Sequence, residues 1–278
     1  MRIRIAHETI YRYDTPATKA IQILRMMPRN HDGQYVVRWR VEVSEDCRVE
    51  PREDAFGNLT HTFTIDGPIS ELAVRVAGEV ETQDTQGIVR GTREKFPPSF
   101  YLRQTDLTAP NPAIMDWADE MNDTGRRPAL ETLHALQQAI YSNFTFDVNA
   151  TVPSTTASQA FANKHGVCQD YAHIFCSAAR YLKIPARYVG GYFLRGDGVV
   201  DMESGHAWTE AFMPDLGWIA FDPANGICAT EAHVRVATGL DYLGAAPVRG
   251  TRYGGVGEAM NVKVTVDQAS RQSQQQNQ

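Results

Sequence analysis

Three residues in the second half of the chain have side chains that together could break or transfer an amide bond. Cys168 offers a thiol, His206 an imidazole and Asp222 a carboxylate, in that order along the sequence. Thiol chemistry at an amide carbonyl needs a sulfur nucleophile, a base that takes its proton and an acid that orients the base. The sequence therefore predicts a cysteine enzyme with a Cys168–His206–Asp222 triad.

Cys168 stands at the predicted start of a helix. Gly166 permits a sharp entry, an apolar stripe follows at helical spacing, and Ile184-Pro185 ends the helix near Lys183. A thiol in the first helical turn meets free backbone N–H groups and the positive end of the helix dipole, which both favour the thiolate. The same N–H groups can stabilise an oxyanion. The alternative, a small buried side chain, is typical of free cysteines and fits Cys176 in mid-helix.

His206 begins a predicted strand, and Asp222 ends the next one. The segment 213–217 (Met-Pro-Asp-Leu-Gly) is typical of a turn, so two antiparallel strands return Asp222 to the level of His206. A carboxylate beside an imidazole fixes its tautomer and supports the imidazolium during proton transfer. The other seven histidines, including His165 and His173, are predicted to be solvated or structural.

The composition excludes several other classes of protein. The chain has 278 residues, 42% of them hydrophobic, which is enough for one large core or two smaller ones. Its net charge is −6 and it has no basic stripe, so nucleic acid is not expected as a partner. We expect no membrane span, because no apolar stretch approaches about 20 residues. We expect no signal peptide, because charges interrupt the apolar residues at the N-terminus.

The four cysteines, Cys47, Cys168, Cys176 and Cys228, are spaced irregularly, unlike a disulfide framework or a CxxC metal site. This spacing favours a reducing, cytoplasmic location, in which a thiol nucleophile stays reduced. A metal held by the three triad residues would have suitable ligands, but neither an HExxH motif nor paired CxxC motifs support it. No metal and no cofactor are therefore predicted.

The hydrophobic pattern changes near residue 100. Before it, alternating residues and turn clusters predict short strands, as in an antiparallel β-sandwich. After it, helical spacing dominates until the period of two returns from Arg187 to Phe221. We predict an N-terminal β-sandwich domain at 1–100, a catalytic domain at 101–268 and a disordered polar tail at 269–278. The strands of the first domain are expected at 2–5, 36–43, 61–65 and 72–80.

A family resemblance rests on three motifs, which are Gly166-Val167-Cys168-Gln169-Asp170-Tyr171-Ala172, His206-Ala207-Trp208-Thr209-Glu210 and Phe221-Asp222-Pro223-Ala224-Asn225-Gly226. They resemble the bacterial transglutaminase-like family, whose members are described as cysteine peptidases and have an N-terminal β domain. The resemblance also covers 184–192, the strand-rich first hundred residues, and the C-terminal segment from 241 to 250.

The resemblance implies an α+β fold with a papain-like, transglutaminase-like core. In that core a helix presents the thiol to an antiparallel sheet that carries the histidine and the aspartate. It also implies that Cys168, His206 and Asp222 are the catalytic residues.

Substrate contacts are less well determined by the sequence. Tyr192 and Arg249 are candidate substrate-binding residues by resemblance, and Trp208 joins them as a residue of the pocket wall or the core. Papain-like enzymes add a second oxyanion donor from a side chain upstream of the cysteine. Among the aromatic residues just upstream of Cys168, only Tyr141 has a donor, so this second donor stays unassigned.

Three functions fit the sequence. The first is a hydrolase that cleaves a peptide or amide bond through an acyl-enzyme on Cys168. The second is an acyl transferase that passes the same acyl group to an amine, as in transglutamination. The third is a non-catalytic binding module on the same fold, against which the intact triad argues. The expected partner is a peptide or protein amide, and the sequence gives no oligomeric state.

Overall fold

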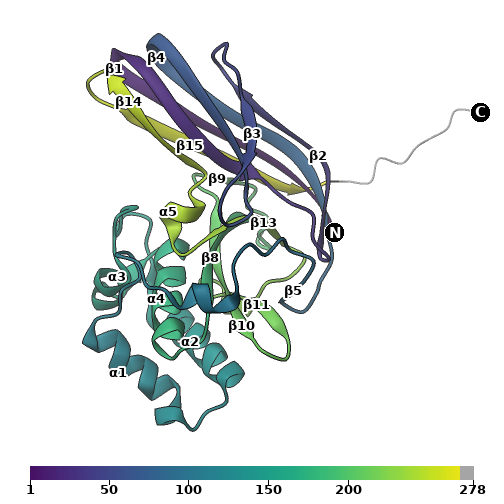
Figure 1. Cartoon of the computed structure of the whole chain (residues 1–278), viewed down its shortest axis with the longest axis vertical. Coiled ribbons are helices and arrows are strands. Elements are labelled where there is room, and N and C mark those ends of the chain that lie inside the picture. Colours follow the sequence, from purple (N-terminus) through teal and green to yellow (C-terminus); the bar gives the residue numbers. More distant parts are fainter. Residues whose placement is uncertain (270–278) are drawn as a thin grey trace, which may run out of the picture.

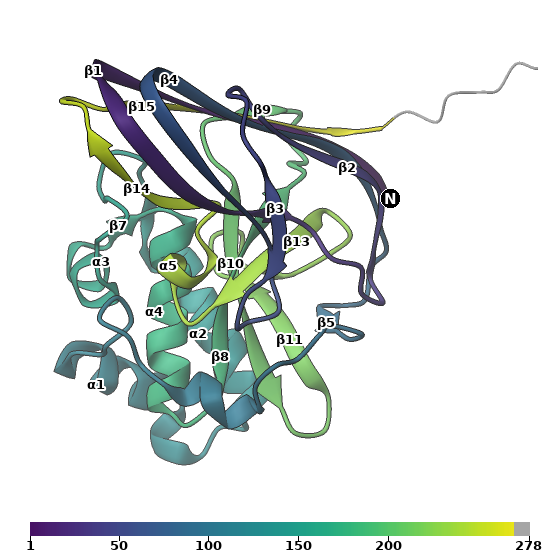
Figure 2. The same ribbon diagram turned by 45° about the horizontal axis from the view of Figure 1, so that its top comes forward.

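The computed structural model describes residues 1–269 and has two parts, a set of long strands and a mixed unit of helices and strands (Figure 1). The long strands lie along one side of the molecule, and the helices gather on the opposite side of a second sheet (Figures 1 and 2). This is the α+β architecture that the sequence predicted. Except for Ala269, the polar tail predicted at 269–278 lies outside the described residues.

Two long strands, β1 (Arg2–Met27) and β4 (Leu59–Thr82), form the centre of the first sheet. They pair antiparallel, and their register shifts between Arg12 and Ala17. At this point a Cβ on Gly67 of β4 would lie 2.5 Å from the Ala17 carbonyl oxygen, so the close approach requires glycine. Such irregularities bend a strand. The first and second halves of β1 can therefore belong to different layers, and so can those of β4.

The remaining strands of this sheet are β2 (Gln34–Val43), β3 (Glu50–Glu53), β9 (Asp201–Met202), β14 (Val248–Gly254) and β15 (Ala259–Gln268). β15 pairs with the first half of β1, and β2 pairs with the second half of β4. β14 pairs with the second half of β1, and β3 pairs with the first half of β4. One hydrophobic cluster contains Leu24 and Phe63 from one layer and Leu72 and Val74 from the other. The two layers thus share a core in the manner of a sandwich.

Both ends of the chain build this sheet. The sequence analysis placed residues 101–268 in the catalytic domain, whereas β14 and β15 pair with β1. Alternation of apolar residues predicts a strand but not its partner, and the partner here lies at the opposite end of the chain. The segment Asp14-Thr15-Pro16 has the composition of a turn, yet it lies within β1, where the register with β4 shifts. The short strands expected from the sequence are therefore parts of longer ones.

The second sheet has the order β12-β11-β10-β8-β13, with β5 paired to β11. The strands that the sequence predicted between Arg187 and Phe221 correspond to β8, β10 and β11. All pairs in this sheet are antiparallel. The bounds are β5 (Ile88–Val89), β8 (Ala186–Phe193), β10 (His206–Met213), β11 (Gly217–Asp222), β12 (Ile227–Cys228) and β13 (His233–Gly239).

Four helices pack together and against this sheet, and α4 is the most buried of them (Figure 1). All eleven residues of α4 from Asp170 to Arg180 are buried, and Phe175 of α4 stacks on Phe221 of β11 with ring centroids 5.3 Å apart. No helix within residues 1–269 is long and apolar enough to cross a membrane. The helices are α1 (Pro112–Met121), α2 (Ala129–Asn143), α3 (Ala157–Asn163), α4 (Cys168–Tyr181) and the short α5 (Tyr242–Ala245), and β6 (Thr145–Phe146) pairs in parallel with β7 (His165–Gly166).

The first sheet covers the free edge of the second. Strand β13 is an edge strand, and an edge exposes unpaired backbone groups. Gln34 accepts a hydrogen bond from the N–H of Arg235 and donates one to its carbonyl oxygen, at 2.8 and 2.9 Å. Asn58 makes the same pair of bonds with Thr238, both at 2.8 Å. Two side-chain amides thus take the place of a neighbouring strand and join the two parts.

We expect Asn58→Ala to lower the free energy of unfolding by about 1–3 kcal/mol, because it leaves the N–H and C=O of Thr238 buried without partners. Urea denaturation followed by tryptophan fluorescence would measure the loss. Asn149→Ala, at an exposed position, is the matched control and should change the value by less than about 0.5 kcal/mol. Equal stability of the two variants would contradict this account of the interface.

Candidate active site

Cys168 is the first residue of α4, as the sequence predicted, and a buried carboxylate fixes the turn that carries it. The Asp170 side chain accepts hydrogen bonds from the N–H of Val167 at 2.9 Å and from the hydroxyl of Thr151 at 2.6 Å. A Cβ on Gly166 would lie 2.7 Å from the same carboxylate oxygen. Glycine at 166 therefore leaves room for the carboxylate that caps the nucleophile helix.

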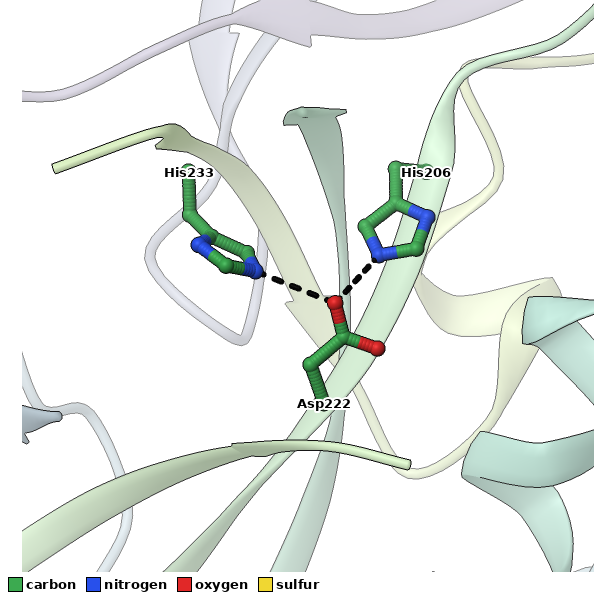
Figure 3. Close-up of side chains that lie close together, drawn as sticks. All are labelled: His206, Asp222 and His233. Carbon is green, nitrogen blue, oxygen red and sulfur yellow. Dashed lines mark hydrogen bonds and ion pairs between the residues drawn. The ribbon is translucent and has the colours of Figure 1, made fainter. Parts of the chain in front are cut away.

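The hairpin of β10 and β11 brings His206 and Asp222 together, as the alternation and the turn predicted. His206 Nε2 lies 2.7 Å from Asp222 Oδ2 (Figure 3). Burial disfavours the charged imidazole, but the negative charge of Asp222 and the hydrogen bond to it outweigh burial and raise the pKa of His206 to about 10. The imidazole is therefore protonated at neutral pH.

Cys168 lies close enough to His206 to raise the pKa of its imidazole. Because Nε2 is engaged with Asp222, Nδ1 is the nitrogen that remains for Cys168, and a hydrogen bond with the Cys168 side chain adds to the rise in the pKa of His206. Cys168 is only partly buried. The structure thus brings the thiol, the imidazole and the carboxylate into one chain of contacts.

Asp222 has no exposed surface, and its two oxygens accept five hydrogen bonds. Oδ1 accepts from the N–H groups of Ala224 and Asn225, at 3.0 and 3.2 Å. Oδ2 accepts from His206, from Asn225 Nδ2 at 2.7 Å and from His233 Nε2 at 3.1 Å. Burial opposes ionisation of Asp222, but the charge and hydrogen bond of His206, followed by His233, hold its pKa well below its usual range.

Two of these partners were not identified as site residues from the sequence. Asn225 was noticed only as part of a motif, although its place three residues after Asp222 in a tight turn is a local signal for a bond to that side chain. His233 was grouped with the structural histidines. It reaches Asp222 because β13 pairs with β8, a non-local pairing that leaves no mark in the sequence around it.

The candidate substrate-binding residues have different surroundings. Tyr192 is 4% exposed, and its hydroxyl bonds to His7 of β1, at 3.0 Å from Nδ1. Trp208 is 1% exposed and stacks on the His206 ring at 5.9 Å between centroids. Both side chains are buried, as expected for a residue of the core in the case of Trp208, and their contact with substrate stays a prediction. Arg249 is exposed on β14, and its role stays a prediction.

Three atoms of the site have the types and spacing of metal ligands. His206 Nε2, Asp222 Oδ2 and His233 Nε2 lie within 4.8 Å of one another, and imidazole and carboxylate groups are common ligands of Zn²⁺. This set includes His233 in place of the thiol that the sequence analysis considered. The same atoms already lie at hydrogen-bond distance from one another, with His206 and His233 both on Asp222 Oδ2. The hydrogen bonds of the cluster thus account for its spacing without a metal ion.

Two family models match the chain. Residues 3–81 match the bacterial transglutaminase-like N-terminal region, and residues 116–223, which include Cys168, His206 and Asp222, match the transglutaminase-like superfamily. An uncharacterized protein of Mycobacterium leprae is 30% identical, over 96% of this chain and 98% of its own. The chain belongs to the transglutaminase-like superfamily, whose members are generally cysteine enzymes.

Two further proteins are similar. A Cytophaga hutchinsonii structure named a "Putative Cysteine Protease" covers 97% of this chain and 91% of its own, with a TM-score of 0.78 and 19% identity. A protein-glutamine gamma-glutamyltransferase of Pseudomonas aeruginosa is 29% identical over 164 residues, which are 52% of this chain and 24% of its own. The transglutaminase-like, papain-like fold that the resemblance implied is thereby confirmed.

The four cysteines should differ in reactivity towards iodoacetamide at neutral pH. Burial raises the pKa of Cys176 to about 11 and also raises the pKa of Cys47 and of Cys228, so these thiols are less ionised than usual. Cys168 is paired with a protonated imidazole and should alkylate first, even near pH 6. Mass spectrometry of peptides from the labelled protein gives the order. Equal labelling of all four in the folded protein would remove the case for an activated nucleophile.

Proposed function

We propose that this protein is a cysteine-dependent hydrolase that cleaves a peptide or amide bond through an acyl-enzyme on Cys168. The observation that carries the proposal is the 2.7 Å bond between His206 and the buried Asp222, with Cys168 on the other side of the same imidazole at the start of α4. This arrangement supplies nucleophile, acid–base group and orienting carboxylate in one place.

The first half of the reaction forms a thioester. The Cys168 thiolate attacks the carbonyl carbon, and the carbonyl oxygen becomes an oxyanion. The N–H groups of Cys168 and Gln169 make no hydrogen bond within the described residues, so they are free to donate to that oxyanion. The His206 imidazolium gives its proton to the amine nitrogen, the carbon–nitrogen bond breaks, and the amine leaves.

The second half releases the acyl group. Neutral His206 takes a proton from water, the resulting hydroxide adds to the thioester carbonyl, and the carbon–sulfur bond breaks. The product is a carboxylic acid, and the enzyme returns to the thiolate–imidazolium pair. In both halves the ionised Asp222 supports the imidazolium and holds Nδ1 towards the sulfur.

Acyl transfer to an amine is the second candidate. The similarity to a protein-glutamine gamma-glutamyltransferase over half of this chain favours it, and it uses the same thioester. The two activities differ only in the acceptor, which is water in one case and an amine in the other.

Intact-mass spectrometry of the protein with a set of candidate peptides, with and without a primary amine, would test the proposal. A hydrolase should form an acyl adduct on Cys168 and release a free carboxylic acid whether or not the amine is present. An amide of the added amine as the main product would replace hydrolysis by transfer. A protein that forms neither adduct nor product with any peptide would support a binding module.

Substitutions in the triad should differ in the size of their effects. Cys168→Ala and His206→Ala should reduce turnover to near background, because they remove the nucleophile and the acid–base group. Asp222→Asn keeps the shape but removes the charge that supports the imidazolium, a loss of up to about 10⁴-fold in a serine triad. It should be milder here, because the helix terminus also supports the thiolate. Steady-state turnover of a peptide that the wild type accepts would give the order.

Cys176→Ala is the matched control for the triad variants, since it removes a thiol from the same helix at a buried position away from the site. It should keep turnover close to that of the wild type. Substantial turnover by Cys168→Ala would overturn the assignment of the nucleophile.

A further inference from the structure

We propose that His233 is a positioning residue of the triad, a neutral hydrogen-bond donor that holds Asp222 and limits how strongly its carboxylate attracts the proton of His206. The proposal rests on the proposed function, because it assigns a role within the same site. It also gives the N-terminal sheet a part in the chemistry.

The tautomer of His233 follows from its two partners. The N–H of Thr230 donates to His233 Nδ1 at 3.1 Å, so Nδ1 has a free lone pair and the hydrogen is on Nε2. Nε2 lies 3.1 Å from Asp222 Oδ2 and therefore donates to it (Figure 3). Burial lowers the pKa of His233, more than the nearby carboxylate raises it. The ring therefore donates without carrying a charge.

The ring of His233 is enclosed by aromatic side chains. Its ring packs against Phe193 of β8 at 4.6 Å and against Trp208 of β10 at 5.2 Å between centroids. The titratable groups that face it are Asp222 and His206, and its side chain is 2% exposed. The Nε2–H group of His233 thus donates to one atom, Asp222 Oδ2.

That oxygen is shared with His206. Both imidazoles donate to Asp222 Oδ2, at 2.7 Å from His206 and 3.1 Å from His233. The Asn225 side chain donates to the same oxygen at 2.7 Å. Each further donor on an ionised oxygen takes up part of its negative charge and weakens its pull on the His206 proton. Because the pKa of His206 is already raised to about 10, any further rise would make the imidazolium a poorer acid for the leaving amine.

Loss of His233 should change the negative charge that Asp222 presents to His206 more than it changes the position of the carboxylate. The carboxylate would keep its other partners, the N–H groups of Ala224 and Asn225 on Oδ1 and the Asn225 side chain and His206 on Oδ2. The expected result is a shorter, stronger His206–Asp222 bond. Such a change slows acylation but leaves substrate binding intact.

Residues of the first sheet bond to the chain on both sides of His233. The Thr82 hydroxyl of β4 donates to the carbonyl of Glu231 at 2.5 Å. Gln34 of β2 makes its two bonds with the backbone of Arg235. These contacts lie two residues before and two residues after His233, so the N-terminal sheet sets where its ring stands relative to Asp222.

Two substitutions at one position test the proposal. His233→Gln can place an amide N–H near the position of Nε2 and keep the donation, whereas His233→Leu fills the space without a donor. We expect His233→Leu to lower kcat by about three- to tenfold with little change in KM, following Brønsted behaviour for a weaker acid. The basic limb of its kcat profile should move to higher pH. His233→Gln should recover most of both effects.

Proton NMR at neutral pH reports the same bond without a substrate. The His206 Nε2–H resonance, assigned by its loss in His206→Ala, should move downfield in His233→Leu and return in His233→Gln. His7→Leu is the matched control, since it removes another buried imidazole that bonds to Tyr192 and Thr9, away from Asp222. It should cost stability and leave the resonance and the pH limb in place.

The outcomes separate this inference from the proposed function. Should His233→Leu fail to fold by circular dichroism, His233→Asn replaces it, because its shorter side chain cannot reach Asp222 and should give the same shifts. A folded variant without the donor that keeps the resonance, kcat and basic limb of an active wild type overturns the role of His233 alone. A wild type that never forms an acyl adduct on Cys168 refutes the proposed function instead.

Discussion

The burial of one negative charge organises the active site. Asp222 has no exposed surface, and a buried carboxylate is stable as an ion only where donors and positive charge replace water. Its five hydrogen bonds come from the start of β10, from the turn after β11 and from the start of β13. Three segments must therefore meet at one side chain, and the pairing of β8 with both β10 and β13 is what makes them meet.

The N-terminal sheet packs against the part of the molecule that carries this site. Ile3 of β1 and Val264 of β15 lie in one hydrophobic cluster with Tyr188 of β8, and Cys168 packs against that cluster. Burial of apolar side chains on both sides of this interface stabilises it but does not set the relative position of the two sheets. The amides of Gln34 and Asn58 set that position, because they bond to particular residues of β13. The position of β13, and of the histidine at its start, thus depends on strands more than a hundred residues away.

Much of the fold and the central part of the site could be predicted because their signals are local. The helix that begins at Cys168 and the hairpin that ends at Asp222 are both visible as periodicity and turn residues, and the expected labelling of the four cysteines follows from that placement. The partner of β15 and the approach of His233 to Asp222 could not be predicted, since each depends on which strands pair. Alternating residues give the face of a strand but not its neighbour.

Two side chains of β13 donate hydrogen bonds to two buried carboxylates, and only one of the two donors is a permanent cation. His233 donates to Asp222, and Arg235, two residues later on the same face, donates to Glu210 of β10 at 2.7 Å. Glu210 also binds Arg187 at 2.6 Å, so two guanidinium groups balance its buried charge. In the proposed mechanism, Asp222 instead supports a charge that appears and disappears on His206. In that mechanism a cation at 233 would compete with the imidazolium for the same oxygen, whereas a neutral imidazole takes up only part of the carboxylate's charge and leaves the rest to support His206.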